Sequence, residues 1–194
     1  MKRACLAFVL FLVASPALAA NDWATTGKGG SAGNLTPAQV EAAWAEMPRY
    51  QAGQDQKALL AMNWVVINSM NDPGQRAATA ARLAKLLEDP ATTADARQFI
   101  CAQLYQVGTE AEVATVAPLL LDPATSDMAR LFLERVKSEA SSAALRAALD
   151  KLEGRPLIGV ANSLSIIGDE ASVAKIIALT KSQDAAVALA AWRA

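Results

Sequence analysis

The stretch that decides the fold is Gly108-Thr-Glu-Ala-Glu-Val-Ala-Thr-Val-Ala-Pro-Leu-Leu120. It recurs as Gly168-Asp-Glu-Ala-Ser-Val-Ala-Lys-Ile-Ile-Ala-Leu-Thr180, with Gly, Glu, Ala, Val, Ala and Leu identical in register. A unit of similar size, residues 125–153, lies between the copies, so the period is about 30 residues, as in helical-hairpin repeats. Such repeats bury their apolar faces only against neighbours. The sequence therefore predicts an all-α fold, a right-handed α-solenoid of stacked antiparallel helical hairpins.

Apolar spacing and stop signals divide the rest of the chain into helices. Thr36 with Pro37 marks the first helix start, because the hydroxyl can accept an orphan backbone N–H and proline has none to lose. Pro118 should kink its helix near the end. No segment alternates with period two, so strands have little support. The expected hairpins are 56–70 with 74–87, 93–107 with 110–121, 126–136 with 141–152, and 156–167 with 170–181, before a last helix from 184.

The N-terminus predicts export. Lys2 and Arg3 precede an apolar run, and Ala17-Leu-Ala19 offers small residues for cleavage, which is the pattern of a signal peptide over residues 1–19. Residues 20–35 are rich in Gly, Ser and Thr and predict a flexible linker. The helical domain then spans 36–194, and we expect a periplasmic or extracellular protein without a membrane span.

Charge argues against a nucleic-acid partner. The chain has 18 Lys and Arg, and removal of two with the signal peptide leaves 16 against 19 acidic residues, a net charge of −3. Nucleic-acid binders need a basic face, whereas here both signs are interleaved. We expect no such partner.

Residue content also limits catalysis. The chain has no histidine, which removes the commonest general base and zinc ligand. Cys101 is the only cysteine after processing and is expected in the core, since its neighbours are apolar. We therefore expect no catalytic, metal or cofactor site.

One motif could suggest a nucleophile. Ser172-Val-Ala-Lys175 matches the Ser-x-x-Lys pattern of penicillin-binding enzymes. The sister repeat has Glu112-Val-Ala-Thr115 in the same places, which favours surface positions on a repeat helix. A change at Glu112 should then cost under about 0.5 kcal/mol.

Several polar and aromatic residues have structural interpretations. Asn162 and Ser163 lie in an otherwise apolar helix, where a buried polar group commonly bonds a neighbouring element. Gly159 should permit close approach of a neighbour. Trp44 and Trp64 sit at helical apolar spacing and are expected in the core.

The sequence from Arg97 to Val113, the run Leu119-Leu-Leu-Asp-Pro-Ala-Thr-Ser-Asp-Met-Ala-Arg130 and the second copy at 168–173 resemble HEAT repeats. More narrowly, residues 56–194 resemble the short phycobilisome-lyase-like HEAT arrays of secreted planctomycete and verrucomicrobial proteins. The resemblance implies an armadillo-like fold and that such arrays often precede another secreted domain, for instance a β-sandwich related to glycoside hydrolases. Bilin-lyase chemistry is cytoplasmic, so the export signal argues against that activity.

Two functions remain open. The first is a non-enzymatic exported scaffold whose concave face, made by the second helix of each hairpin, contacts a protein partner or an adjoining domain. The alternative is an accessory module of a larger secreted carbohydrate-active, glycoside hydrolase-like enzyme. The residues expected on the concave face are Arg82, Lys85, Glu112, Thr115, Arg146, Asp150 and Lys175.

The last helix should leave apolar surface uncovered. Val187, Leu189 and Trp192 supply its apolar residues, and no partner helix follows in the sequence. Terminal repeats normally present a polar outer face. We therefore expect a C-terminal truncation or self-association through this edge.

Overall fold

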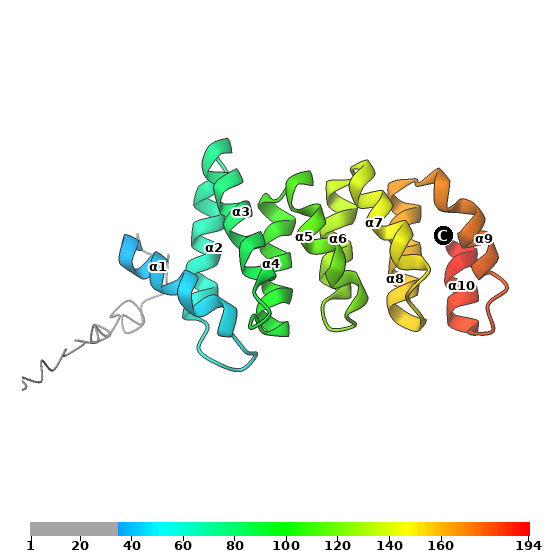
Figure 1. The fold of residues 1–194 in the computed structure, drawn as a ribbon, viewed down its shortest axis with the longest axis horizontal. Helices are drawn as coiled ribbons and strands as arrows, with labels where there is room; N and C mark the ends of the chain where they lie inside the picture. The colour runs from blue at the N-terminus through cyan, green and yellow to red at the C-terminus, as the bar shows by residue number, and fades with distance from the viewer. Residues whose placement is uncertain (1–34) are drawn as a thin grey trace, which may run out of the picture. The chain divides into compact units, whose positions relative to one another are not determined.

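The computed structural model describes residues 35–194, and every regular element in that range is a helix (Figure 1). This confirms the predicted all-α class. The predicted signal peptide and nearly all of the predicted linker lie outside the described residues. The α-helices are α1 (Pro37–Glu46), α2 (Lys57–Ser69), α3 (Pro73–Glu88), α4 (Ala94–Val107), α5 (Val113–Val116), α6 (Ser126–Val136), α7 (Glu139–Leu149), α8 (Gly154–Ile167), α9 (Val173–Leu179) and α10 (Ala185–Arg193), and the 3-10 segments are η2 (Met47–Arg49), η3 (Glu110–Glu112), η4 (Ala117–Leu121) and η5 (Glu170–Ser172).

Neighbouring helices contact one another in two series. In the first, α2 packs on α4, α4 on α6, α6 on α8, and α8 on α10. In the second, α3 packs on α5 and α5 on α7. Figure 1 shows these helices following one another in chain order. The three predicted hairpins over residues 56–152 each contribute one helix to each series, and α8 and α10 extend the first.

Local hydrogen bonds set the helix starts. Thr36 and Gln39 form a reciprocal capping box at α1, with Pro37 at the first helical position. The Asp72 carboxylate accepts from the backbone N–H groups of Gly74 and Gln75 at 2.8 and 3.0 Å and so caps α3. These side chains satisfy donors that a helix start leaves without partners. The start predicted at Thr36 is confirmed.

The two repeated glycines have different structural roles. Gly168 has φ +73°, a left-handed conformation that ends α8 and that glycine adopts without a steric penalty. Gly108 is extended, with φ −70°. A Cβ built there would lie 2.7 Å from a ring carbon of Phe132. Close packing against α6 therefore requires glycine at Gly108, whereas backbone conformation requires it at Gly168.

The segment expected as one helix over residues 110–121 is a composite. It runs from η3 through the single α-helical turn of α5 into η4. Pro118 lies at the start of η4, and a proline removes one backbone donor there. The predicted irregularity is thus a change of helix type, from α to 3-10, close to the stop at Asp122.

The deepest part of the core lies along the first series of helices. Ile100 and Leu104 of α4, Phe132 and Leu133 of α6, and Leu164 of α8 are each fully buried. They belong to one continuous apolar cluster that extends from α1 to α10. Burial of apolar area of this kind contributes roughly 25 cal/mol per Å² and is the main stabilising contribution.

We predict that Leu104→Ala lowers the free energy of unfolding by about 2–5 kcal/mol, because it leaves a cavity beside residues that cannot fill it. Leu60→Ala on α2 is the matched control, since Leu60 is 52% exposed, and should cost under about 0.5 kcal/mol. Urea denaturation followed by circular dichroism measures both. Equal losses for the two variants would contradict the assigned core.

A second prediction concerns Cys101, where burial raises the pKa of the thiol to about 12. An exposed thiol has a pKa of about 8.5, so unfolding releases a proton at alkaline pH. The stabilising contribution of the neutral thiol is complete below about pH 8.5 and is lost as pH rises toward 12. In a Cys5→Ser background, stability should fall more steeply between pH 8 and 10 than in the same chain with Cys101→Ala. The native thiol should also resist a disulfide reagent at pH 8, and rapid native labelling would refute its burial.

Candidate functional site

Among the seven residues expected on a concave face, hydrogen bonds and ion pairs within the described chain join one pair only, Asp150 and Lys175, with 2.6 Å between Oδ2 and Nζ. Lys85 is exposed, and Thr115 is half-buried. Arg82 and Arg146 are bonded to residues outside the set. The charged members thus mostly tie one helix to another.

Arg82 on α3 is held by α1. Its guanidinium donates two parallel hydrogen bonds to Glu41, at 2.8 and 2.6 Å. It also stacks over Trp44, 4.4 Å from the ring centroid. The hydrogen bond from Arg82 lowers the pKa of the Glu41 carboxyl, and the same bond raises the pKa of Arg82. A bidentate fork on an aromatic ring is a geometry that arginine favours. Trp44 is buried, as predicted, whereas Trp64 is only half-buried.

Arg146 on α7 joins two carboxylates. It donates to Glu139 at 2.5 Å on its own helix and to Asp169, which precedes η5. The hydrogen bond to Glu139 is the largest cause of a raised Arg146 pKa. Asp169 is mostly buried, and its Oδ2 has no hydrogen-bond partner among the described residues. The arginine therefore anchors the last hairpin to α7.

Glu112 was expected at the surface, and this expectation is wrong. Its side chain is buried, and its Oε2 accepts from the backbone N–H of Thr109 at 2.7 Å. The Thr109 hydroxyl in turn accepts a backbone N–H of η3. The two side chains form a capping box. Glu112 is thus unavailable as a contact residue.

Ser172 also differs from its expected surface position. It is fully buried, and its hydroxyl donates to the Asp169 carbonyl at 2.8 Å. Lys175 is occupied by Asp150. A Ser-x-x-Lys nucleophile needs the lysine beside the serine hydroxyl to take its proton, and neither side chain is arranged for that transfer.

Of the two polar residues singled out in α8, Ser163 packs as interpreted from the sequence, whereas Asn162 is half-buried and its side chain makes no hydrogen bond among the described residues. The Ser163 hydroxyl donates to Glu134 Oε2 at 2.7 Å, across to α6. A Cβ built on Gly159 would lie 2.7 Å from the Nε of Arg130, which is also on α6, so a larger residue at this position would meet the Arg130 side chain. Ser163 makes the predicted bond to a neighbouring helix, and Gly159 permits the predicted close approach.

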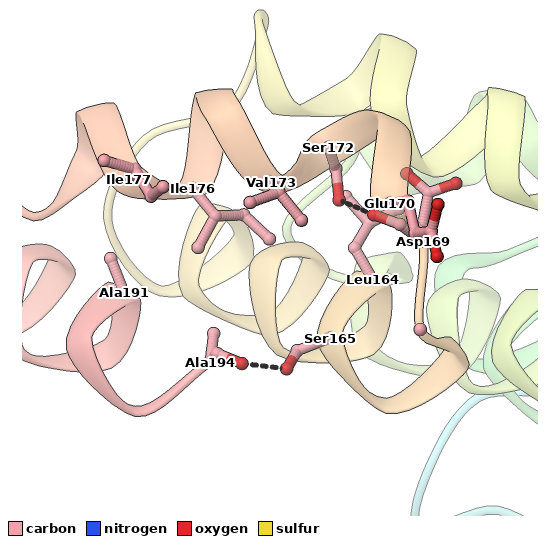
Figure 2. A pocket seen from close by; sticks show the side chains of 11 residues that line it. Leu164, Ser165, Asp169, Glu170, Ser172, Val173, Ile176, Ile177, Ala191 and Ala194 are labelled. Carbon is pink, nitrogen blue, oxygen red and sulfur yellow. Dashed lines mark hydrogen bonds between the residues drawn. The ribbon is translucent and has the colours of Figure 1, made fainter.

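The sequence did not predict an apolar groove between α8, α9 and α10. The groove encloses about 330 Å³, and Figure 2 shows Ile176 and Ile177 facing Ala191 across it. Ser165 of α8 donates to the carbonyl oxygen of Ala194, which fixes the end of α10 at one edge. The polar rim includes Asp169 and Glu170. Apolar walls with a few polar groups at the rim are typical of binding sites.

The residues of α9 are less covered by neighbouring helices than their sequence equivalents in α5. Val113 is 4% exposed, but its repeat equivalent Val173 is 50% exposed. The α5 helix lies between α3 and α7, whereas α9 packs mainly on α10. The sequence held a hint, because Ile177 replaces the small Ala117 of the sister repeat. Only the neighbours decide whether such a residue is covered.

The outer face of α10 is also apolar. Val187 is buried, but Leu189 and Trp192 are 51% and 75% exposed. This agrees with the expectation that the last helix leaves apolar side chains uncovered.

The described residues hold no group of three His, Cys, Asp or Glu side chains placed to bind a metal ion. No helix among residues 35–194 is long and apolar enough to cross a membrane.

We predict that Glu112→Ala lowers the free energy of unfolding by about 1 kcal/mol, because it removes half of a capping box. Glu112→Gln is the matched control, since glutamine can accept the same backbone hydrogen bond. Thermal and urea unfolding would measure both variants. A loss for Ala below about 0.5 kcal/mol would restore the surface interpretation.

Comparisons of the chain with models of protein families, with characterised proteins and with solved structures found no match.

Proposed function

We propose that the protein is an exported, non-enzymatic scaffold, a HEAT-type α-solenoid with a repeat of about 30 residues, that binds another protein. The observation that carries the proposal is the apolar groove of the C-terminal hairpin. Its exposed side chains, Val173 and Ile177, lie beside a preformed hollow. Exposed apolar surface with a polar rim favours association with a protein.

Two features support a binding role over a catalytic one. The chain has no histidine, so the commonest proton-transfer group is missing from its chemistry. The hydroxyl of Ser172 is buried and bonded to a backbone carbonyl. The export proposal rests on the pattern of residues 1–19, with its two basic residues, apolar run and Ala17-Leu-Ala19.

Site-specific photo-crosslinking tests the binding role. Benzoylphenylalanine in place of Ile177 should give a discrete adduct with a partner protein in cells that make the full chain. The matched control is Ile67 on α2, because the two isoleucines have similar exposure, 58% and 60%. Val173→Glu should lower the adduct yield about tenfold, since a charge placed in an apolar contact costs on the order of 1–3 kcal/mol.

Two outcomes would contradict the proposal. Equal, diffuse adducts from Ile177 and Ile67 would mean that the groove binds nothing specific. Stoichiometric modification of Ser172 by an acyl-serine probe would refute the non-enzymatic assignment. An adduct to another domain of the same polypeptide would favour the accessory-module alternative.

A further inference from the structure

A second hollow lies on the side of the hairpins where α3 begins and where α4 and α6 end. It encloses about 270 Å³ and is lined by Arg76, Val107, Thr109, Glu110, Arg135 and Val136 among others. We call it the Arg76–Arg135 pocket. It shares no lining residue with the groove between α8, α9 and α10.

Arg135 is held in place within this pocket by neutral groups. Its Nη2 donates to the carbonyl oxygen of Gly108, and its guanidinium lies over Tyr105, 5.6 Å from the ring centroid. Arginine has five N–H donors, so most of them remain available. Burial, with a smaller contribution from the like charge of Arg76, lowers the Arg135 pKa. The guanidinium is thus oriented by its neighbours without being neutralised by them.

Neither arginine has an anionic partner in the described chain. No carboxylate among residues 35–194 lies within 4.0 Å of the guanidinium of Arg76 or Arg135, although Arg82, Arg130, Arg146 and Arg155 each have one. Glu110 lines the pocket but is paired with neither. Two neighbouring cations without a counter-charge make a concave site that attracts an anion.

Arg82 shows how an arginine beside an aromatic ring is paired with a carboxylate in this protein. It stacks on Trp44 and donates hydrogen bonds to both carboxylate oxygens of Glu41. Arg135 lies over Tyr105 at a longer distance, 5.6 Å from the ring centroid against 4.4 Å for Arg82, and has no carboxylate partner in the described chain. Both arginines lie over an aromatic ring, but Arg135 donates to the Gly108 backbone carbonyl where Arg82 donates to a carboxylate.

We infer that the Arg76–Arg135 pocket binds the carboxylate of an acidic side chain of a partner protein. The inference rests on the proposed protein-binding function. A planar carboxylate matches the two-pronged fork of an arginine. Val136, which is half-buried at the pocket, provides apolar contact for the methylene groups that carry a glutamate carboxylate. Glu110 at the same pocket disfavours a doubly charged phosphate more than a singly charged carboxylate.

A titration with matched tripeptides tests the pocket without the partner. Acetyl-Ala-Glu-Ala-amide and acetyl-Ala-Gln-Ala-amide would be added at constant ionic strength to the ¹⁵N-labelled full chain, with inorganic phosphate as a third probe. The Glu peptide should shift the amide signals of Gly108 and Thr109 and the Nε signal of Arg135 saturably, with a Kd of about 1–10 mM for a solvent-open site with one or two charge-assisted hydrogen bonds. The Gln peptide should bind at least about tenfold more weakly.

Variants separate the pocket from general charge effects. Arg76→Gln should weaken Glu-peptide binding about tenfold, and its fold should be unaffected because the Arg76 side chain makes no hydrogen bond among the described residues. Arg135→Lys keeps the charge but loses the fork, and should also weaken binding. Glu110→Gln should tighten it about twofold by removing a like charge. Arg193→Gln is the control, since Arg193 is exposed on α10 and distant in sequence from the pocket.

Any of four results would overturn the inference: equal binding of the two peptides, tighter binding of phosphate at the same signals, an equal effect of Arg76→Gln and Arg193→Gln, or the absence of any saturable shift. Failure here would leave the crosslinking result at Ile177 unchanged, because that experiment examines another surface. Loss of the Ile177 adduct with normal peptide binding would instead refute the groove as the protein-binding site.

Discussion

Burial of apolar side chains between successive helix pairs is the constraint on which the rest of the structure depends. The most deeply buried residues, such as Leu104, Phe132 and Leu164, come from α4, α6 and α8. Each of these helices has another helix of its series on both sides. A single hairpin of this size cannot bury its apolar face alone. Where the described residues provide no covering helix, apolar side chains are exposed, as Ile177 and Trp192 are.

Polar contacts between helices determine which helix faces pack against one another. Arg82 with Glu41 and Lys175 with Asp150 join separate elements. Both pairs are substantially exposed, and such pairs contribute little to stability. Their geometry nevertheless defines which faces lie together, because a shift of one turn would separate the charges. Ser163 and its carboxylate partner on α6 act similarly in a less exposed setting.

The helical class and the helix starts could be predicted from the sequence because they depend on nearby residues. Thr36, Pro37 and the spacing of apolar side chains are sufficient to place a helix start. Burial depends instead on what the fold places alongside. Glu112 was expected outside because its repeat equivalent is a different residue, yet its role is to accept a backbone N–H three residues earlier. The pattern Thr-x-x-Glu at 109–112 carried that information as a capping box. The Arg76–Arg135 pocket brings together residues from three predicted hairpins, so no local pattern could reveal it, and the groove had only the weak signal of Ile177 in place of Ala117.

Repeated sequence does not mean repeated environment, and the differences between equivalent positions locate the candidate sites. Val113 and Val173 are the same residue in the same register, but one is covered by neighbouring helices and the other borders a groove. Gly108 and Gly168 are likewise equivalent, yet only Gly108 must admit a ring from α6. Most side chains of the described helices find their partners within the chain. The two candidate sites are the places where such a partner is missing, an apolar helix face at the groove and a carboxylate at the Arg76–Arg135 pocket.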